Sequence, residues 1–133
     1  MRIDHIGYAV EDAEAGIKAL TALGFVFDAP IEDEARKVKL AFGTLDGYRV
    51  ELVAPTADDS PVSRLLKTVG PTPYHLCYAS ADLDAEIERL RRYGARTLIP
   101  PAPAVAFGGR RVVFMYSLAI GTFEIVETSE VAD

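Results

Sequence analysis

The sequence predicts an α+β domain made of two tandem β-α-β-β-β units, because it contains an internal repeat. Its only two histidines, His5 and His75, lie seventy positions apart in the similar segments IDHIGYAV and PYHLCYAS. A second pair of similar segments, YRVELVAP and GTFEIVET, carries Glu51 and Glu124. A repeat of this length fixes the architecture because each copy is one structural unit. Identical residues also recur at the same seventy-residue offset in five further pairs: Asp12 and Asp82, Ala15 and Ala85, Ile17 and Ile87, Leu20 and Leu90, Gly24 and Gly94.

The composition is that of a folded, soluble domain of ordinary size. The chain has 133 residues, of which half are apolar and about a quarter are charged, with a net charge of −6. No run of basic residues exceeds two, so we do not expect nucleic acid as a partner. No apolar run is long enough for a membrane span, and no basic-then-apolar leader opens the sequence. The single cysteine, Cys77, is typical of a reducing compartment, so we expect a cytoplasmic protein.

The first unit is predicted over residues 1–55. Alternating residues rich in Ile, Tyr and Val indicate strands, and apolar residues at helical spacing indicate a helix that Asp12 begins and Gly24 ends. Asp46-Gly47 is a strong hairpin signal. In chain order, the predicted elements are a strand at 2–10, a helix at 12–23, a short strand at 25–30, a charged loop at 31–36, and strands at 37–45 and 47–55.

A linker at 56–72 and a second unit at 73–128 complete the predicted domain. In the linker, Asp59-Ser60-Pro61 indicates a cap followed by a short helix through Lys67. The second unit repeats the first, with Asp82 as the helix cap and a Pro- and Gly-rich loop at 100–109. Its strands are predicted at 74–80, 97–99, 111–117 and 121–128, and the tail at 129–133 is predicted to fray.

The two His and two Glu residues are candidate metal ligands. A lone His or Glu in a strand is more often a core or surface residue, but four at repeat-equivalent positions are harder to explain that way. If both sheets curl into one barrel, alternate side chains on the strands can bring all four to its concave side. An uncompensated buried carboxylate is costly, and a metal removes that cost. This mixed nitrogen and oxygen set suits Co, Ni, Zn or Mn with open positions for substrate.

With these motifs, the chain resembles the vicinal-oxygen-chelate superfamily, which includes glyoxalase I, methylmalonyl-CoA epimerase, extradiol dioxygenases and bleomycin resistance proteins. The resemblance covers about residues 2–128 and is carried by DHIGYAVED, YRVELVAP, PYHLCYA and FEIVE. It implies a single domain over 1–133 that forms a half-open mixed β-barrel, and it implies a homodimer. It also implies that His5, Glu51, His75 and Glu124 hold a divalent metal.

The resemblance implies an enzyme, and the epimerase branch is favoured. VELVAPTADDSPVSRLL is similar to the epimerase pattern, and the implied reaction moves a proton alpha to a thioester through a metal-stabilised enolate. Glu124 is then the expected proton carrier, with Glu51 as its partner. Two alternatives stay open. One is glyoxalase I, which moves a proton between adjacent carbons of a glutathione hemithioacetal, and the other is a metal-free small-molecule binding protein of the resistance type. The expected partner is a small-molecule thioester of the CoA or glutathione type.

Four basic residues are candidates for substrate binding. Lys39 stands where some epimerases have a second acid–base Glu, and it could instead hold the free carboxylate of the substrate. Arg49 shares a strand face with Glu51, so it could pair with that carboxylate or orient substrate. Arg110 and Arg111 follow two glycines and could meet a CoA phosphate or a glutathione carboxylate. For Lys39, Arg110 and Arg111, an exposed structural position is the alternative interpretation.

Overall fold

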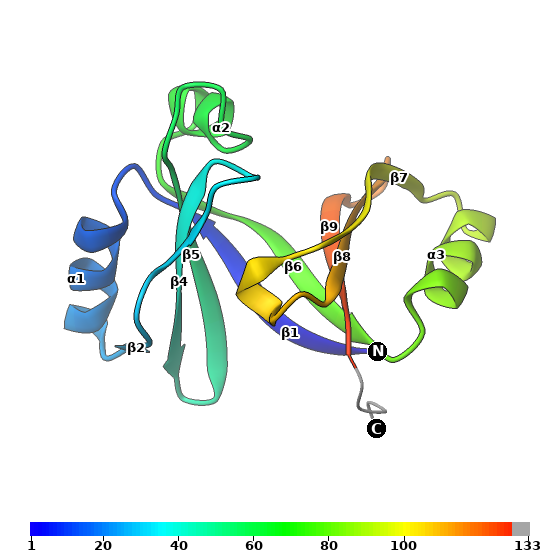
Figure 1. Cartoon of the computed structure of the whole chain (residues 1–133), viewed down its shortest axis with the longest axis horizontal. Helices are drawn as coiled ribbons and strands as arrows, with labels where there is room; N and C mark the ends of the chain where they lie inside the picture. The colour runs from blue at the N-terminus through cyan, green and yellow to red at the C-terminus, as the bar shows by residue number, and fades with distance from the viewer. Residues whose placement is uncertain (129–133) are drawn as a thin grey trace. The chain divides into compact units, whose positions relative to one another are not determined.

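The computed structural model describes residues 1–128 and contains two compact units (Figure 1). The N-terminal unit comprises His5–Tyr74, and the C-terminal unit comprises Met1–Asp4 together with the chain from His75 onward. The linker predicted at 56–72 thus falls within the N-terminal unit, and Met1–Asp4 falls with the second repeat. The tail predicted to fray, 129–133, lies outside the described residues.

The N-terminal unit contains the predicted β-α-β-β-β plan and the linker helix. Its strands run in the order β2-β4-β5-β1, with β3 beside β4. β1 and β5 are parallel, and the other pairs are antiparallel. In chain order, the elements are β1 (Arg2–Ala9, which belongs to this unit from His5 onward), α1 (Ala13–Leu23), β2 (Val26–Phe27), β3 (Ile31–Asp33), β4 (Val38–Leu45), β5 (Tyr48–Pro55) and α2 (Ser63–Thr68).

The C-terminal unit repeats this plan, which confirms the predicted fold class. Its strands run in the order β6-β9-β8-β7, and its first and last strands along the chain, β6 and β9, are again parallel. In chain order, the elements are β6 (Thr72–Ser80, which belongs to this unit from His75 onward), α3 (Leu83–Arg92), β7 (Arg96–Pro103), the 3₁₀ turn η1 (Val105–Phe107), β8 (Arg111–Ser117) and β9 (Gly121–Glu127).

The helix starts are set by equivalent side-chain caps. The Asp12 carboxylate accepts a hydrogen bond from the backbone N–H of Ala15 at 2.8 Å. The Asp82 carboxylate accepts one from Ala85 at 3.1 Å. Each bond satisfies one of the backbone donors that the first turn of a helix leaves without an intrahelical partner. Gly24 ends α1 in the left-handed conformation, with φ of 114°, which glycine adopts without strain.

Three local predictions were wrong. The segment at 31–36 was predicted to be a loop, but it contains β3, and the buried Asp33 carboxylate there bonds the Arg36 guanidinium at 3.0 Å. The strand predicted at 97–99 extends through 96–103 as β7, despite its three prolines. Proline is tolerated there because β7 is an edge strand with register shifts at Ile99. Helix α2 begins only at Ser63, without a side-chain cap, so Ser60 is not its cap.

Helices α1 and α3 each cover one face of the sheet in their own unit. α1 packs on β5 through Leu52 and Ala54, which form a buried apolar cluster with Val10 and Ala13. α3 packs on β9 beside the corresponding cluster. That cluster contains Leu83, Ile87, Ala95, Val113, Met115, Phe123 and Ile125. Because side chains alternate along a strand, Glu51 and Glu124 lie on the faces that the helices do not cover.

Within residues 1–128, every helix is too short or too polar to cross a membrane.

Candidate functional site

The first His–Glu pair lies inside the N-terminal unit. In the parallel ladder of β1 and β5, Gly7 is opposite Glu51, and His5 is two residues before Gly7 on the same face. His5 Nε2 is 3.2 Å from Glu51 Oε1. Only 1% of His5 and 6% of Glu51 is exposed, so a polar pair is held away from water in the face opposite α1.

The second pair, in the C-terminal unit, has the same geometry. Cys77 is opposite Glu124 in the parallel ladder of β6 and β9, and His75 is two residues before Cys77. His75 Nε2 is 3.2 Å from Glu124 Oε1, and both side chains are buried. The equal registers and distances show that the sequence repeat is a repeat of local geometry. Cys77 is fully buried among Ala79, Ala104, Val112 and Val126, as its interpretation as a small core residue predicts.

A phenylalanine accompanies each pair, and sequence reasoning did not assign either one to the site. Phe42 on β4 is directly opposite Glu51, and its ring is edge-on to His5, with centroids 5.6 Å apart at 74°. Phe114 on β8 is directly opposite Glu124, and its ring is edge-on to His75 at 5.4 Å and 82°. The signal that could have found them is their offset of seventy-two positions, which lies between the offsets of the His and Glu pairs.

The donor chemistry of each pair fits a divalent metal. Two donors at about 2.1 Å from one ion are roughly 3.0 Å apart at a right angle and roughly 3.4 Å apart at a tetrahedral angle. The 3.2 Å between His Nε2 and Glu Oε1 in each unit lies in this range. A neutral imidazole and a carboxylate are also the donor types that Co, Ni, Zn and Mn accept. Each pair can therefore supply two neighbouring ligands.

Lys39 lies away from the Glu51 face, which argues against its predicted place in the substrate site. It is opposite Ala54 in the ladder of β4 and β5, and Ala54 belongs to the cluster beneath α1. Its ammonium group pairs with the Glu14 carboxylate of α1 at 2.9 Å. The hydrogen bond to Glu14 raises the pKa of Lys39, so the side chain stays protonated and cannot accept a proton at neutral pH.

Arg49 lies on the face of Glu51, two residues earlier on β5, as predicted. Its guanidinium lies over the Phe42 ring, 3.9 Å from the centroid, in a cation–π arrangement. The equivalent position in the C-terminal unit is Thr122, two residues before Glu124. The two repeats therefore match in His, Phe and Glu and differ in charge at this position.

Arg111 pairs with two carboxylates, which argues against the predicted role in phosphate binding. Its guanidinium bonds Glu127 at 2.7 Å and Asp84 at 3.1 Å. The hydrogen bonds that it donates to the Glu127 and Asp84 carboxylates raise its pKa. Arg110 is exposed, and its backbone takes part in the turn after η1 through bonds with Ala104 and Phe107. Of the two predicted arginines, only Arg110 stays a candidate for binding an anion.

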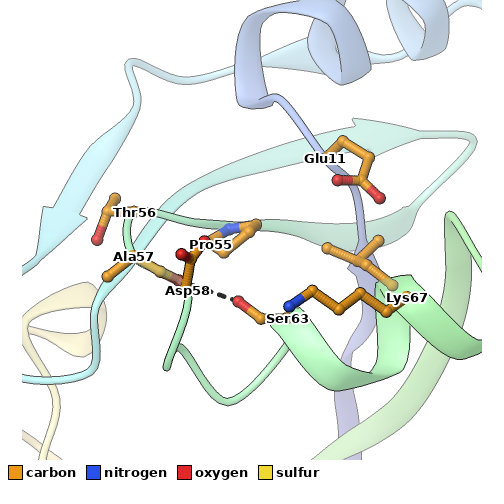
Figure 2. A pocket seen from close by; sticks show the side chains of 8 residues that line it. Glu11, Pro55, Thr56, Ala57, Asp58, Ser63 and Lys67 are labelled. Carbon is orange, nitrogen blue, oxygen red and sulfur yellow. Dashed lines mark hydrogen bonds between the residues drawn. The ribbon is translucent and has the colours of Figure 1, made fainter.

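A separate pocket of about 310 Å³ opens in the N-terminal unit, between the end of β5 and α2 (Figure 2). The Ser63 hydroxyl donates to the Ala57 carbonyl at 3.0 Å at one side of it. Carboxylates outnumber the single ammonium group of its lining, so the pocket does not favour a phosphate. None of the predicted site residues lines it. Its lining consists of Glu11, Pro55, Thr56, Ala57, Asp58, Ser63, Leu66 and Lys67.

The two units and their His–Glu pairs define a protein of the Glyoxalase/Bleomycin resistance protein/Dioxygenase superfamily, to which this chain belongs. The model of that family matches residues 4–114. The chain is 32% identical over 117 residues to the ethylmalonyl-CoA/methylmalonyl-CoA epimerase of Cereibacter sphaeroides, a match that covers 86% of this chain and 87% of the relative.

Solved structures give the same result for the fold. The methylmalonyl-CoA epimerase from Mycobacterium tuberculosis matches with a TM-score of 0.85 and 25% identity, over 97% of this chain and 89% of that one. A methylmalonyl-CoA epimerase in complex with methylmalonyl-CoA and NH4+ matches with a TM-score of 0.83 and 30% identity, over 99% and 97% of the two chains. The predicted family and fold are thus confirmed.

Proposed function

We propose that this protein is a divalent-metal-dependent isomerase that moves the proton alpha to a CoA thioester, as a methylmalonyl-CoA epimerase does. The observation that carries the proposal is the duplicated, buried His–Glu pair with a 3.2 Å spacing in each unit. Its support from relatives is the 32% identity to an ethylmalonyl-CoA/methylmalonyl-CoA epimerase and the likeness to an epimerase that binds methylmalonyl-CoA.

The proposed ligands are His5, Glu51, His75 and Glu124, each of which offers one nitrogen or oxygen donor. Co, Ni, Zn and Mn are the proposed metals, because they accept imidazole and carboxylate together. The chemistry supplied by a bound divalent cation is electrostatic stabilisation of the negative charge that develops on the enolate oxygen.

The proposed proton carriers are the two buried glutamates. A carboxylate oxygen of Glu124 takes the proton from the alpha carbon, and the C–H electron pair moves toward the thioester oxygen. Glu51, which carries a proton at the start of the step, donates that proton to the other face of the carbon and inverts the centre. Glu124 is then protonated and Glu51 ionised, and proton exchange of both groups with solvent returns them to their starting states. Lys39 does not serve as the second base, since it is protonated and paired with Glu14 beneath α1.

Arg49 is the proposed contact for the free carboxylate of a malonyl-type acyl group. It lies on the Glu51 face, and its guanidinium lies over the Phe42 ring, 3.9 Å from the centroid. A planar guanidinium can bond a carboxylate with two parallel hydrogen bonds. Arg110, exposed at the turn before β8, is the proposed contact for a CoA phosphate.

The alternatives receive less support. The relatives reported above are named as epimerases of ethylmalonyl-CoA or methylmalonyl-CoA, so glyoxalase I is not favoured. A metal-free binding protein would not require two buried carboxylates beside imidazoles, whose burial is costly without compensation. A homodimer and a cytoplasmic location remain predictions.

The test is proton NMR of methylmalonyl-CoA in heavy water with the cobalt-loaded protein. We expect the alpha-proton signal to disappear faster than in a protein-free control, because each turnover exchanges that proton with solvent. A rate equal to the control, with cobalt bound, would exclude thioester carbon-acid chemistry on this substrate. Repeating the measurement with the hemithioacetal of glutathione distinguishes the glyoxalase alternative.

A further inference from the structure

We propose that Phe42 and Phe114 are positioning residues that hold the imidazoles of His5 and His75 in the orientation needed for metal binding. The inference rests on the proposed function, because it concerns the same four ligands. It goes beyond that function by assigning a role to two apolar side chains that are not ligands and do not carry protons.

The geometry of the two phenylalanines is duplicated. Each lies on the strand next to that of its glutamate, directly opposite it: Phe42 opposite Glu51, and Phe114 opposite Glu124. From there each ring reaches the histidine of the same unit and meets it edge-on, at 5.6 Å and 74° for Phe42. The corresponding values for Phe114 are 5.4 Å and 82°.

Edge-to-face packing is a preferred arrangement of aromatic rings, because the positive edge of one ring meets the negative face of the other. An imidazole packed in this way cannot turn freely about its bond to Cβ. Its Nε2 therefore stays directed at the glutamate oxygen 3.2 Å away in each unit. Groups that orient a ligating histidine contribute to metal affinity because less side-chain freedom is lost on binding.

The two positions differ in one contact. The Phe42 ring also carries the Arg49 guanidinium at 3.9 Å, whereas the residue equivalent to Arg49 in the other repeat is Thr122. A change at Phe42 thus disturbs both a proposed ligand and the proposed carboxylate contact. A change at Phe114 tests the positioning role without involving an arginine stack.

The experiment compares Phe42→Leu and Phe114→Leu with a matched control, Phe123→Leu. Phe123 belongs to the same sheet as Phe114 but lies on the face beneath α3, where its ring meets Tyr78 edge-on at 6.1 Å. The control therefore removes an aromatic contact of the same kind from the core. For each variant, cobalt affinity is measured by competition with a chelator, together with the visible absorption spectrum of the bound cobalt.

We expect each site variant to bind cobalt about 10- to 100-fold more weakly than wild type, with an altered spectrum, as when groups that orient metal ligands are removed. The control should lose thermal stability yet keep the wild-type affinity and spectrum. Phe42→Tyr and Phe114→Tyr keep the aromatic ring, so they should keep the cobalt affinity of wild type. If a leucine variant fails to fold, a tyrosine variant that folds but loses cobalt affinity would still contradict the inference. Phe42→Leu alone should also raise KM for the CoA thioester.

Unchanged cobalt affinity in folded Phe42→Leu and Phe114→Leu would overturn the inference, as would an equal loss of affinity in Phe123→Leu. These results leave the proposed function intact if the wild-type protein binds cobalt and exchanges the alpha proton. Failure of the wild-type protein to bind cobalt would instead contradict the proposed function itself.

Discussion

Replacing Glu124 with glutamine should strongly slow exchange of the alpha proton of the epimer that Glu124 deprotonates, while leaving the protein folded. The side chain is 5% exposed, and Oε1 is 3.2 Å from His75 Nε2. Glutamine has nearly the same shape, so the surrounding packing of β9 is kept. The change also removes a buried negative charge, and such charges are costly without a partner. We therefore expect the metal-free variant to unfold at the same Tm as wild type or higher.

The expected loss of activity follows from the role of the carboxylate. General acid–base groups contribute about 10²- to 10⁴-fold to rate, so the exchange rate should fall by at least about 100-fold. This corresponds to a rise of about 2.7 kcal/mol in the activation barrier. The amide oxygen can still contact a metal, but the amide cannot accept a proton at neutral pH. The loss should therefore persist when cobalt is saturating.

The assay is loss of the alpha-proton signal of methylmalonyl-CoA in heavy water, at cobalt concentrations that saturate each protein. Glu127→Gln is the matched control, because Glu127 is on the same strand, is only partly buried, and pairs with Arg111. Its exchange rate should equal that of wild type. A Glu124→Gln variant that binds cobalt and exchanges at a rate close to wild type would refute the assignment of Glu124 as the base.

Three further changes test the placement of other side chains. In Gly43→Ala, the new Cβ would lie 2.6 Å from a carbon of the Phe27 ring. This overpacking should lower the free energy of unfolding by about 1–3 kcal/mol, and therefore lower Tm, while cobalt affinity stays unchanged. Lys39→Met should leave the exchange rate at the wild-type value, and a large loss would restore Lys39 to the site. Arg111→Met removes the pairing with Glu127, so it should lower Tm slightly and leave KM for the CoA thioester unchanged, whereas a raised KM would indicate that Arg111 contacts the substrate.

Much of the fold could be predicted from the sequence because its signals are local. Asp12 and Asp82 cap helices through bonds to residues three positions away, which the spacing of the sequence encodes directly. β3 was missed because its charged residues gave no apolar alternation, and the buried Asp33 is compensated by Arg36 in the same turn. The length of β7 was missed because its prolines indicated a loop, and only its position at a sheet edge makes them acceptable.

The sequence by itself determined the repeat and the four candidate ligands, because strand alternation and nearly equal offsets, of 70 positions for the histidines and 73 for the glutamates, place each His and Glu on one face of its own unit. Only the tertiary structure decided on which faces, and beside which carboxylates, the candidate basic residues lie. Both faces of β4 are buried from Val38 to Gly43, apart from the half-buried Lys39, so apolar alternation could not assign Lys39 to the α1 side. Arg111 forms an ion pair with Asp84, which lies 27 positions earlier in the chain. Such pairings depend on which strands and helices become neighbours, and that information is not local.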